Sequence, residues 1–356
     1  MDSKEYQEQS QNQSEGHLEA PEALTNKDSE HQKKKSDRQS QKEKIEEITK
    51  KIEQGVKDIF TSENYKNYLR TLSKFTSYSF NNTILIMSQC STASYVAGYQ
   101  SWIKNFQRHV KKGEKAIQIL APCNYKRTVE KEVVDKNNKP VFGENGKPLT
   151  EKTEVEYTSF KVTSVFDYSQ TEGKELPQLA HKLNGTVEGY SDFMTALTEL
   201  APVPVEFSEV PGNANGYYDL VEKKIVIDKD LDEIMKCKTG LHEVAHSILH
   251  DRENGIEKDQ LPDRRTREVE AESVAYTICQ YYNLDSSDYS FGYILGWSSG
   301  RELSELKSSM ERIRATANDI IKGIDEKLNI KISNTITMDQ KTELMKKPSH
   351  TRRRHR

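Results

Sequence analysis

The sequence predicts an α+β protein whose ordered centre lies between two polar ends. Apolar residues recur at spacings of three and four over residues 45–72 and again over 303–324, which indicates amphipathic helices. Between them, β-branched runs bounded by turn residues indicate strands. A length of 356 residues favours two domains, which we place at 45–175 and 176–330.

Both ends of the chain are too polar to build a core. Residues 1–44 are mainly Gln, Ser, Glu, Lys and Asp, and residues 331–356 finish in a basic cluster. Such segments bury too little apolar surface to offset the entropy lost on ordering, so we expect a disordered arm and a basic tail. The net charge is only −3, so any affinity for nucleic acid must come from a local patch.

The cellular compartment is predicted from what the chain lacks. Its four cysteines stand far apart and form no CxxC pair, which is typical of reduced thiols in a cytoplasmic protein. There is no signal-peptide pattern, and no apolar run approaches the ~20 residues that span a bilayer. We therefore expect a cytoplasmic protein without a membrane partner.

The first domain is predicted to begin with three helices, over 45–60, 62–72 and 82–87. Strands are predicted at 116–120 and 160–166, where apolar and polar residues alternate. The segment 124–158 between them has β-branched flanks and two turns rich in Asn, Gly and Pro. We expect it to form a long, exposed hairpin.

Residues 95–115 combine positive charge with aromatic rings. Between Lys104 and Lys115 five cations stand against one acid. Single-stranded nucleic acid needs both features, because cations neutralise its backbone and flat rings stack on unpaired bases at ~1–3 kcal/mol each. In the alternative interpretation, Trp102 and Phe106 form the buried face of a helix and the lysines are merely solvated. The candidate contacts are Tyr99, Trp102, Lys104, Arg108, Lys111, Lys112 and Lys115.

The second domain is predicted to begin with a helix over 190–200 and a strand over 203–207. A hairpin follows, with strands at 217–220 and 224–228. If its first strand lies at a sheet edge, an extended peptide can pair with it by strand addition. The long amphipathic helix over 303–324 is expected to pack on this domain.

The strongest functional motif is His-Glu-x-x-His, formed by His242, Glu243 and His246. Residues four apart lie on one face of a helix, so both imidazoles can reach one metal ion. Glu243 then lies beside the open coordination position, where a hydrolytic zinc site needs a general base. Asp230 is expected to cap this helix, with Glu233 following in capping-box spacing.

A zinc peptidase needs a third protein ligand, and the helix predicted over 268–279 contains three glutamates. Glu268 and Glu272 are four apart and share a face, whereas Glu270 points elsewhere. This spacing resembles gluzincins, in which a ligand Glu precedes an acid that orients a ligand histidine. Glu268 is therefore assigned as the ligand and Glu272 as the partner of a histidine N–H. Glu270 is the alternative ligand, or else a solvated charge, and His250 is expected to be structural or to support a ligand.

Several short runs carry a family resemblance, at 78–82, 95–102, 108–117, 120–122, 160–162 and 165–173. In this order they resemble the N-terminal domain of ArdC-type antirestriction proteins, over about residues 45–175. Residues 242–250 and 268–275 resemble the metallopeptidase domain of ArdC-type proteins and of the ImmA/IrrE family, over about 175–300.

The resemblance implies a single-stranded-DNA-binding domain followed by a zincin-like metallopeptidase domain, on a conjugative or other mobile element. The implied role is protection of incoming single-stranded DNA, an antirestriction function, with zinc-dependent proteolysis of an unknown protein or peptide. The alternative is a DNA-binding protein whose zincin-like domain is structural and not proteolytic.

Overall fold

The computed structural model describes residues 25–136, 139–143, 146–176, 187–251 and 261–328. The first 24 residues of the predicted arm and the whole predicted tail, 331–356, lie outside this part of the chain. By its internal contacts the chain divides into two compact units, Met1–Glu46 and Glu47–Arg356.

Helix α1 (Thr25–Asp58) corrects the predicted disorder of residues 25–44, because it begins twenty residues before Ile45. No glycine or proline occurs between Thr25 and Gln54, and Lys, Glu and Gln are good helix formers. Extending an existing helix costs far less than nucleating one. The prediction was based on the lack of apolar residues and gave local helix propensity too little weight.

The second unit has one large hydrophobic core, to which both predicted domains contribute. Besides α1, whose Ile48, Ile52 and Val56 belong to it, the helices that contribute to this core are α2 (Ser62–Lys74), α3 (Phe80–Gln89), α5 (Val187–Leu200), α6 (Glu233–Leu249), α7 (Arg264–Tyr281), α8 (Ile294–Ser298) and α9 (Leu303–Lys327). Tyr65 of α2 is fully buried, and its hydroxyl lies 2.8 Å from Ser273 Oγ of α7. The predicted boundary at residue 175 therefore divides the sequence but not this core.

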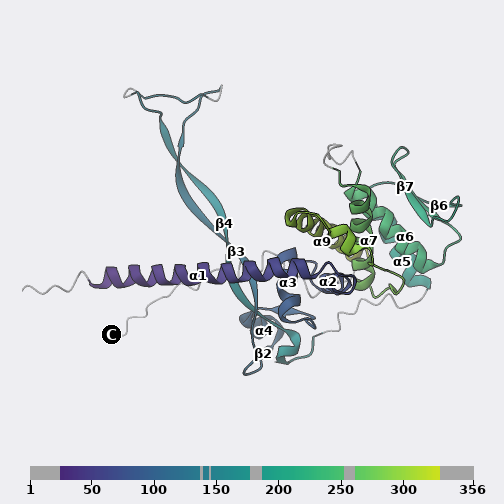
Figure 1. Ribbon diagram of the computed structural model, residues 1–356, viewed down its shortest axis with the longest axis horizontal. Helices are drawn as coiled ribbons and strands as arrows, with labels where there is room; N and C mark the ends of the chain where they lie inside the picture. Colours follow the sequence, from purple (N-terminus) through teal and green to yellow (C-terminus); the bar gives the residue numbers. More distant parts are fainter. Residues whose placement is uncertain (1–24, 137–138, 144–145, 177–186, 252–260, 329–356) are drawn as a thin grey trace, which may run out of the picture. The chain divides into compact units, whose positions relative to one another are not determined.

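An antiparallel sheet with strand order β1-β4-β3 forms next to these helices. It consists of β1 (Val96–Ala97), β3 (Ile117–Glu132) and β4 (Thr150–Asp167). A small core of its own includes Ile86, Ile117 and Val165. Strands β3 and β4 continue beyond this core in an unbroken register that ends at the pair Glu132 and Thr150. The predicted long hairpin is thereby confirmed, and Figure 1 shows its two strands twisting around each other.

The basic stretch of the first domain forms a small substructure beside this sheet. Helix α4 (Tyr99–Phe106) is followed by β2 (Arg108–Val110), which pairs antiparallel with β5 (Thr171–Gly173). A short 3₁₀ helix, η1 (Tyr168–Gln170), joins β4 to β5. Asp167 caps η1 and is fully buried.

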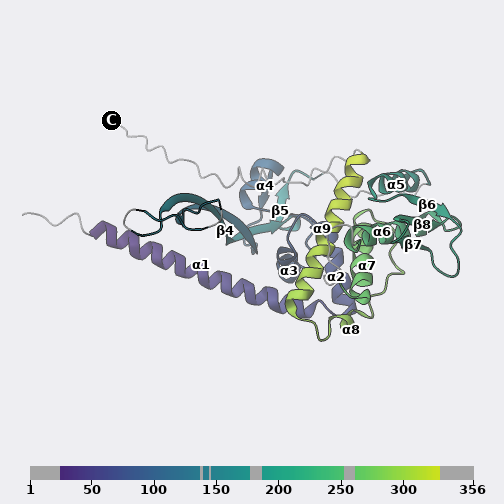
Figure 2. The same cartoon turned by 90° about the horizontal axis from the view of Figure 1, so that it is seen from above.

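A second three-stranded sheet has the order β6-β8-β7 and positions the HExxH helix. Its strands are β6 (Val205–Ser208), β7 (Gly216–Asp219) and β8 (Lys224–Asp228), and β7 pairs antiparallel with β8 at one edge. A Cβ atom on Gly216 would lie 2.7 Å from Thr239 Cγ2 of α6, so glycine permits the close approach of β7 to α6. Figure 2 shows this sheet beside α6. The predicted hairpin and edge strand are confirmed.

None of the helices within the described ranges is long and apolar enough to cross a membrane.

Candidate metal centre

Helix α6 begins at a cap that differs from the predicted one. Asp232, and not Asp230, is the N-cap, and its side chain accepts the N–H of Met235 at 2.8 Å. Asp230 instead lies in a turn in which its own N–H donates to Asp228 Oδ1 at 2.8 Å. Two acids that stand two residues apart are equally good caps, so the sequence alone does not choose between them.

Three potential metal-ligating side chains converge between α6 and α7. The Nε2 atoms of His242 and His246 lie 3.0 Å apart, and Glu268 Oε2 lies 3.6 Å from each of them. Among the residues that the structure describes, this is the group whose ligand atoms all lie within 4.8 Å of one another. The structure thus brings together the three predicted ligands, and two imidazoles with one carboxylate fit a divalent metal that keeps an open coordination position.

The charges of these side chains are strongly coupled. Burial opposes the protonated form of His242, but the nearby carboxylates of Glu268, Glu243 and Glu272 outweigh it and raise its pKa. Burial lowers the pKa of His246, and the adjacent His242 and His250 contribute. The two ligand histidines, each 3.6 Å from its carboxylate, hold the pKa of Glu268 well below its usual range. The site therefore keeps Glu268 ionised and available to a cation.

Glu243 lies beside this group and is almost fully buried. Burial raises the pKa of its carboxyl, partly offset by His242 and by a hydrogen bond from the backbone N–H of Tyr218 on β7. The hydroxyl of Tyr218 donates to Asp251 Oδ2 at 2.5 Å, just beyond the end of α6. Strand β7 is thus fastened to α6 at Glu243 and to Asp251 just beyond the end of that helix.

A buried network supports His246, and of its members sequence reasoning expected a supporting or structural role only for His250. His250 Nδ1 lies 3.0 Å from His246 Nδ1, and His250 Nε2 lies 3.1 Å from Glu270 Oε2. Ser309 and Arg312 of α9 donate to Glu270 Oε1 at 2.6 and 2.5 Å. If Nε2 of His246 binds the metal, the ring proton of His246 is on Nδ1, which donates to Nδ1 of His250. The ring proton of His250 is then on Nε2, which donates to Glu270.

Glu270 is therefore neither a ligand of this group nor a solvated charge, which corrects both alternatives. Its side chain is fully buried. Burial opposes its charged form, but His250 and Arg312 more than offset this and lower its pKa. The spacing of His250 from His246 hinted at the first half of the network, whereas Arg312 lies 42 residues after Glu270 and gave no signal.

Glu272 has a different partner from the predicted one. The hydroxyl of Tyr293 donates a short hydrogen bond to it, and its link to the ligands is electrostatic, because its charge raises the pKa of His242. Burial raises the pKa of Glu272 itself. The partner of a ligand histidine is His250, so the supporting role falls on the pair His250 and Glu270.

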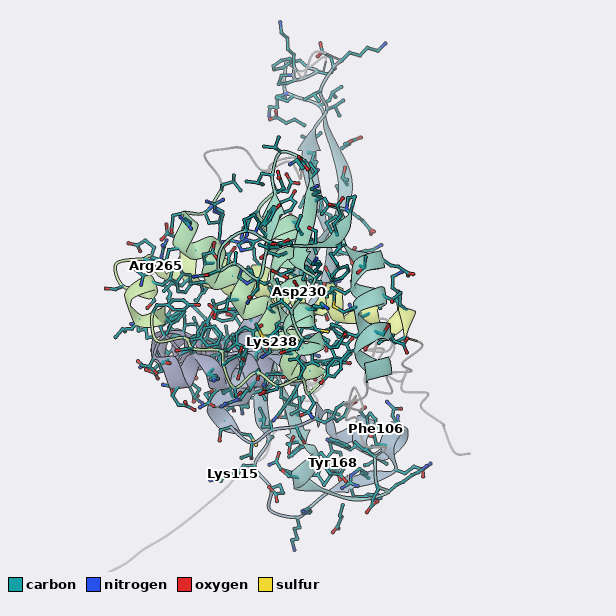
Figure 3. The ribbon with its side chains drawn as sticks, turned by 90° about the vertical axis from the view of Figure 1, so that its right-hand side faces the viewer. Phe106, Lys115, Tyr168, Asp230, Lys238 and Arg265 are labelled. Atoms are coloured by element: carbon teal, nitrogen blue, oxygen red, sulfur yellow. The ribbon has the colours of Figure 1, made fainter. Side chains whose placement is uncertain are left out.

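Two of the seven predicted nucleic-acid contacts are buried. Trp102 has no exposed surface, and its Nε1 donates to the carbonyl of Phe166 at 3.0 Å. Arg108 is 5% exposed, donates to Thr171 and lies 4.2 Å over the ring of Tyr168. The rings of Phe106 and Tyr168, both labelled in Figure 3, have their centroids 5.2 and 6.4 Å from that of Trp102. The structure corrects both assignments, and core packing is the role of Trp102.

The other predicted contacts lie on the surface. Tyr99 is 48% exposed, and the exposed lysines are Lys104, Lys111, Lys112 and Lys115. Lys111 Nζ donates to the carbonyl of Ser169 at 2.8 Å, which holds it against η1. These five residues form what we call the basic face.

The fold and the site together define a class: an α+β protein in which the N-terminal helices share a core with the helices of a two-histidine, one-glutamate candidate metal site. Residues 38–166 match the family model of the N-terminal domain of the anti-restriction factor ArdC. The chain thus resembles ArdC-type antirestriction proteins, as predicted. This match ends before α6 begins, so it does not cover the metal centre.

Other similar proteins extend further along the chain. An uncharacterized protein of Bacillus anthracis is 27% identical over 318 residues, which cover 81% of this chain and 52% of that protein. The chain therefore spans about half the length of this curated relative. Two crystal structures of the antirestriction protein ArdC from the R388 plasmid are also similar. The metal-free one is 19% identical with a TM-score of 0.40, covering 71% of this chain and 85% of that one. The Mn(II)-bound one is 16% identical with a TM-score of 0.39, covering 70% and 84%.

Proposed function

We propose that the protein is a zinc-dependent peptide hydrolase that also binds single-stranded DNA and acts in antirestriction. The observation that carries the hydrolase is the convergence of His242, His246 and Glu268, with Glu243 beside them. Two imidazoles and a carboxylate are ligands typical of catalytic zinc, and the Mn(II)-bound ArdC structure is compatible with a divalent metal.

The chain's own residues suit peptide hydrolysis. A bound cation would polarise the scissile carbonyl and lower the pKa of the attacking water. Glu243 would accept a proton from that water and later deliver it to the leaving amine, and its raised pKa suits both transfers. Strand β7 lies at the sheet edge beside Glu243, so an extended peptide can add to it as a further strand.

The single-stranded-DNA part of the proposal is based on the family match and on the basic face. The matched residues 38–166 include Tyr99, Lys104, Lys111, Lys112 and Lys115, all of which are exposed. Anisotropy titrations with single-stranded and duplex oligonucleotides at two salt concentrations test it. We expect tighter, salt-dependent binding of the single strand. Equal, weak binding to both forms would refute it.

The alternative, a structural and non-proteolytic metal centre, has one observation in its favour. Glu270 joins α6, α7 and α9 through His250 and Arg312, so the region around the metal also braces the core. A metal there would contribute to stability even without catalysis.

Glu243→Gln separates the two possibilities, because Glu243 is not among the ligands and the metal should stay bound. We expect unchanged zinc content by elemental analysis. In cells expressing the wild-type protein, proteomics should find new protein N-termini that are absent with the variant. If the two proteomes are identical while both proteins hold zinc, the metal centre is structural.

A further inference from the structure

The hairpin of β3 and β4 carries an exposed pair of aromatic side chains outside the basic face. Tyr125 and Tyr157 stand directly opposite each other in the register, with ring centroids 5.8 Å apart and an angle of 22° between the rings. They are 49% and 38% exposed. They continue the side of the sheet that buries Ile117 and Ile119, but neither hydrophobic core formed by the described residues includes them. Because both stacked rings are exposed to water, core packing does not account for them.

Exposed charges divide between the two sides of this hairpin. Because side chains alternate along a strand, the odd-numbered residues of the paired strands share the side of the tyrosines. The exposed charged residues on that side, which we call the tyrosine face, are Arg127, Lys131, Glu151 and Lys161. Those on the opposite side are Lys126, Glu130, Glu132, Lys152, Glu154 and Glu156. One side is thus mainly cationic and the other mainly anionic.

The cations of the tyrosine face stand on both sides of the ring pair. Arg127 follows Tyr125 by two residues toward the tip, about 7 Å along the strand at ~3.4 Å per residue. Lys161 lies four residues from Tyr157 in the other direction, about 14 Å away on the same scale. An extended ligand that lies across the two rings therefore meets a positive charge on each side of them.

We propose that the tyrosine face is a base-stacking surface for single-stranded nucleic acid, a proposal that deepens the proposed DNA-binding function and depends on it. Each ring of a parallel pair keeps an outer face, on which an unpaired base can continue the stack. Arg127 and Lys161 neutralise the flanking phosphates. The bases of a duplex are already stacked and paired, so only the backbone of a duplex can contact the tyrosine face.

The test compares two double variants at neighbouring register pairs. Tyr125→Ala/Tyr157→Ala removes the rings, and Asn124→Ala/Thr158→Ala changes the adjacent pair, which faces the opposite side. The probe is fluorescein-labelled oligothymidine of about 20 nucleotides, longer than the ~4–16 that one single-strand-binding fold covers. The tyrosine variant, which loses both stacking positions, is expected to bind at least about 10-fold more weakly, and the control variant like wild type.

Cys123 offers a second measurement that does not depend on affinity. Its exposed thiol lies on the tyrosine face, two residues from Tyr125. We expect oligothymidine to slow the modification of Cys123 by a maleimide, measured by mass spectrometry of the full chain after digestion. A duplex of the same length should protect it less.

Each outcome has a distinct meaning. If the wild-type protein binds oligothymidine but the tyrosine variant binds equally well and Cys123 is not protected, the tyrosine face is not the site and only this proposal fails. If the wild-type protein does not bind oligothymidine, the proposed DNA-binding function fails as well. An equal loss of affinity for duplex and single strand would also overturn the stacking assignment. Circular dichroism of both variants checks that the hairpin stays folded.

Discussion

The metal centre and the tyrosine face hold their side chains in opposite ways. Around the metal centre, His246 is backed by His250, Glu270 and Arg312, which come from three different helices and are mostly buried. On the tyrosine face, Tyr125 and Tyr157 are positioned only by their strand register and by each other. The proposed hydrolysis would need side chains fixed to within a fraction of an ångström, whereas the proposed stacking surface would have to adapt to different bases. The contrast predicts large, cooperative effects of mutations in the first region and small, local effects at the surface.

The largest expected effect tests whether Glu270 braces the metal centre. Glu270→Ala would leave the buried His250 and the guanidinium of Arg312 without their carboxylate, and breaking such a pair costs about 3–5 kcal/mol. Urea unfolding of the metal-free protein measures it. The matched control is Glu268→Ala, two residues earlier on the same helix, whose side chain is 52% exposed.

The control variant is expected to lose bound metal rather than stability. Glu268→Ala should change the free energy of unfolding little but lose bound zinc, as determined by elemental analysis. Full zinc retention by Glu268→Ala would move the third ligand elsewhere. An unfolding free energy of Glu270→Ala equal to that of the wild type would show that the network does not brace the fold.

A smaller effect is expected where the network meets the ligand. His250→Ala removes the partner of His246 Nδ1 and should lower zinc affinity about 10–100-fold, the usual effect of losing a residue that orients a metal ligand. A competition titration with a zinc chelator measures the affinity. His109→Ala is the matched control, because His109 is exposed on β2 and touches none of the ligands. Equal affinities of the two variants would limit His250 to a packing role.

Local geometry and long-range packing also differ in how far the sequence predicted them. The helical period alone turns His242 and His246 to one side, so their convergence depended only on local geometry. By contrast, the burial of Trp102 depends on Phe166, which lies 64 residues further on, and the burial of Glu270 depends on Arg312. Charge and aromatic content identify a surface, but which rings face solvent is decided by packing between distant segments. Once the register of β3 and β4 is known, the alternation of side chains along each strand shows which charged residues lie on each side of the hairpin.

The next prediction separates structural from surface cations within the basic stretch. Arg108→Ala removes a guanidinium that donates to Thr171 and Gly173, so it should destabilise the fold by about 1–3 kcal/mol. Lys112→Ala should change stability by less than about 0.5 kcal/mol. If Lys112 contacts a phosphate, its loss should reduce the salt slope of single-strand binding by ~0.7. Thermal unfolding and titrations at several salt concentrations measure the two effects. If Arg108→Ala instead reduced the salt slope of single-strand binding without destabilising the fold, Arg108 would be a phosphate contact and not a structural residue.

The smallest expected effect concerns an exposed ion pair on the same helix as Glu270. Asp263 caps α7 by accepting the N–H of Thr266, and it lies 2.6 Å from Arg301 Nη2. Burial opposes its charge, but Arg301 and Thr266 outweigh this and lower the pKa of Asp263 to about 2. Because the folded-state pKa lies below the unfolded value of about 3.9, the stabilisation is fully present above pH ~4 and is lost as the pH falls toward 2.

Asp263→Asn keeps a good cap and removes only the charge, so it should cost no more than about 1 kcal/mol near neutral pH, as solvent screens exposed pairs. Urea unfolding of both proteins at pH 6 and near pH 2.5 checks this, and the difference should shrink at the lower pH. A cost near neutral pH as large as that of Glu270→Ala would break the contrast, because an exposed charge on α7 would then matter as much as a buried one. A small cost would show that burial and cross-bracing, and not the number of ion pairs, make the metal centre rigid.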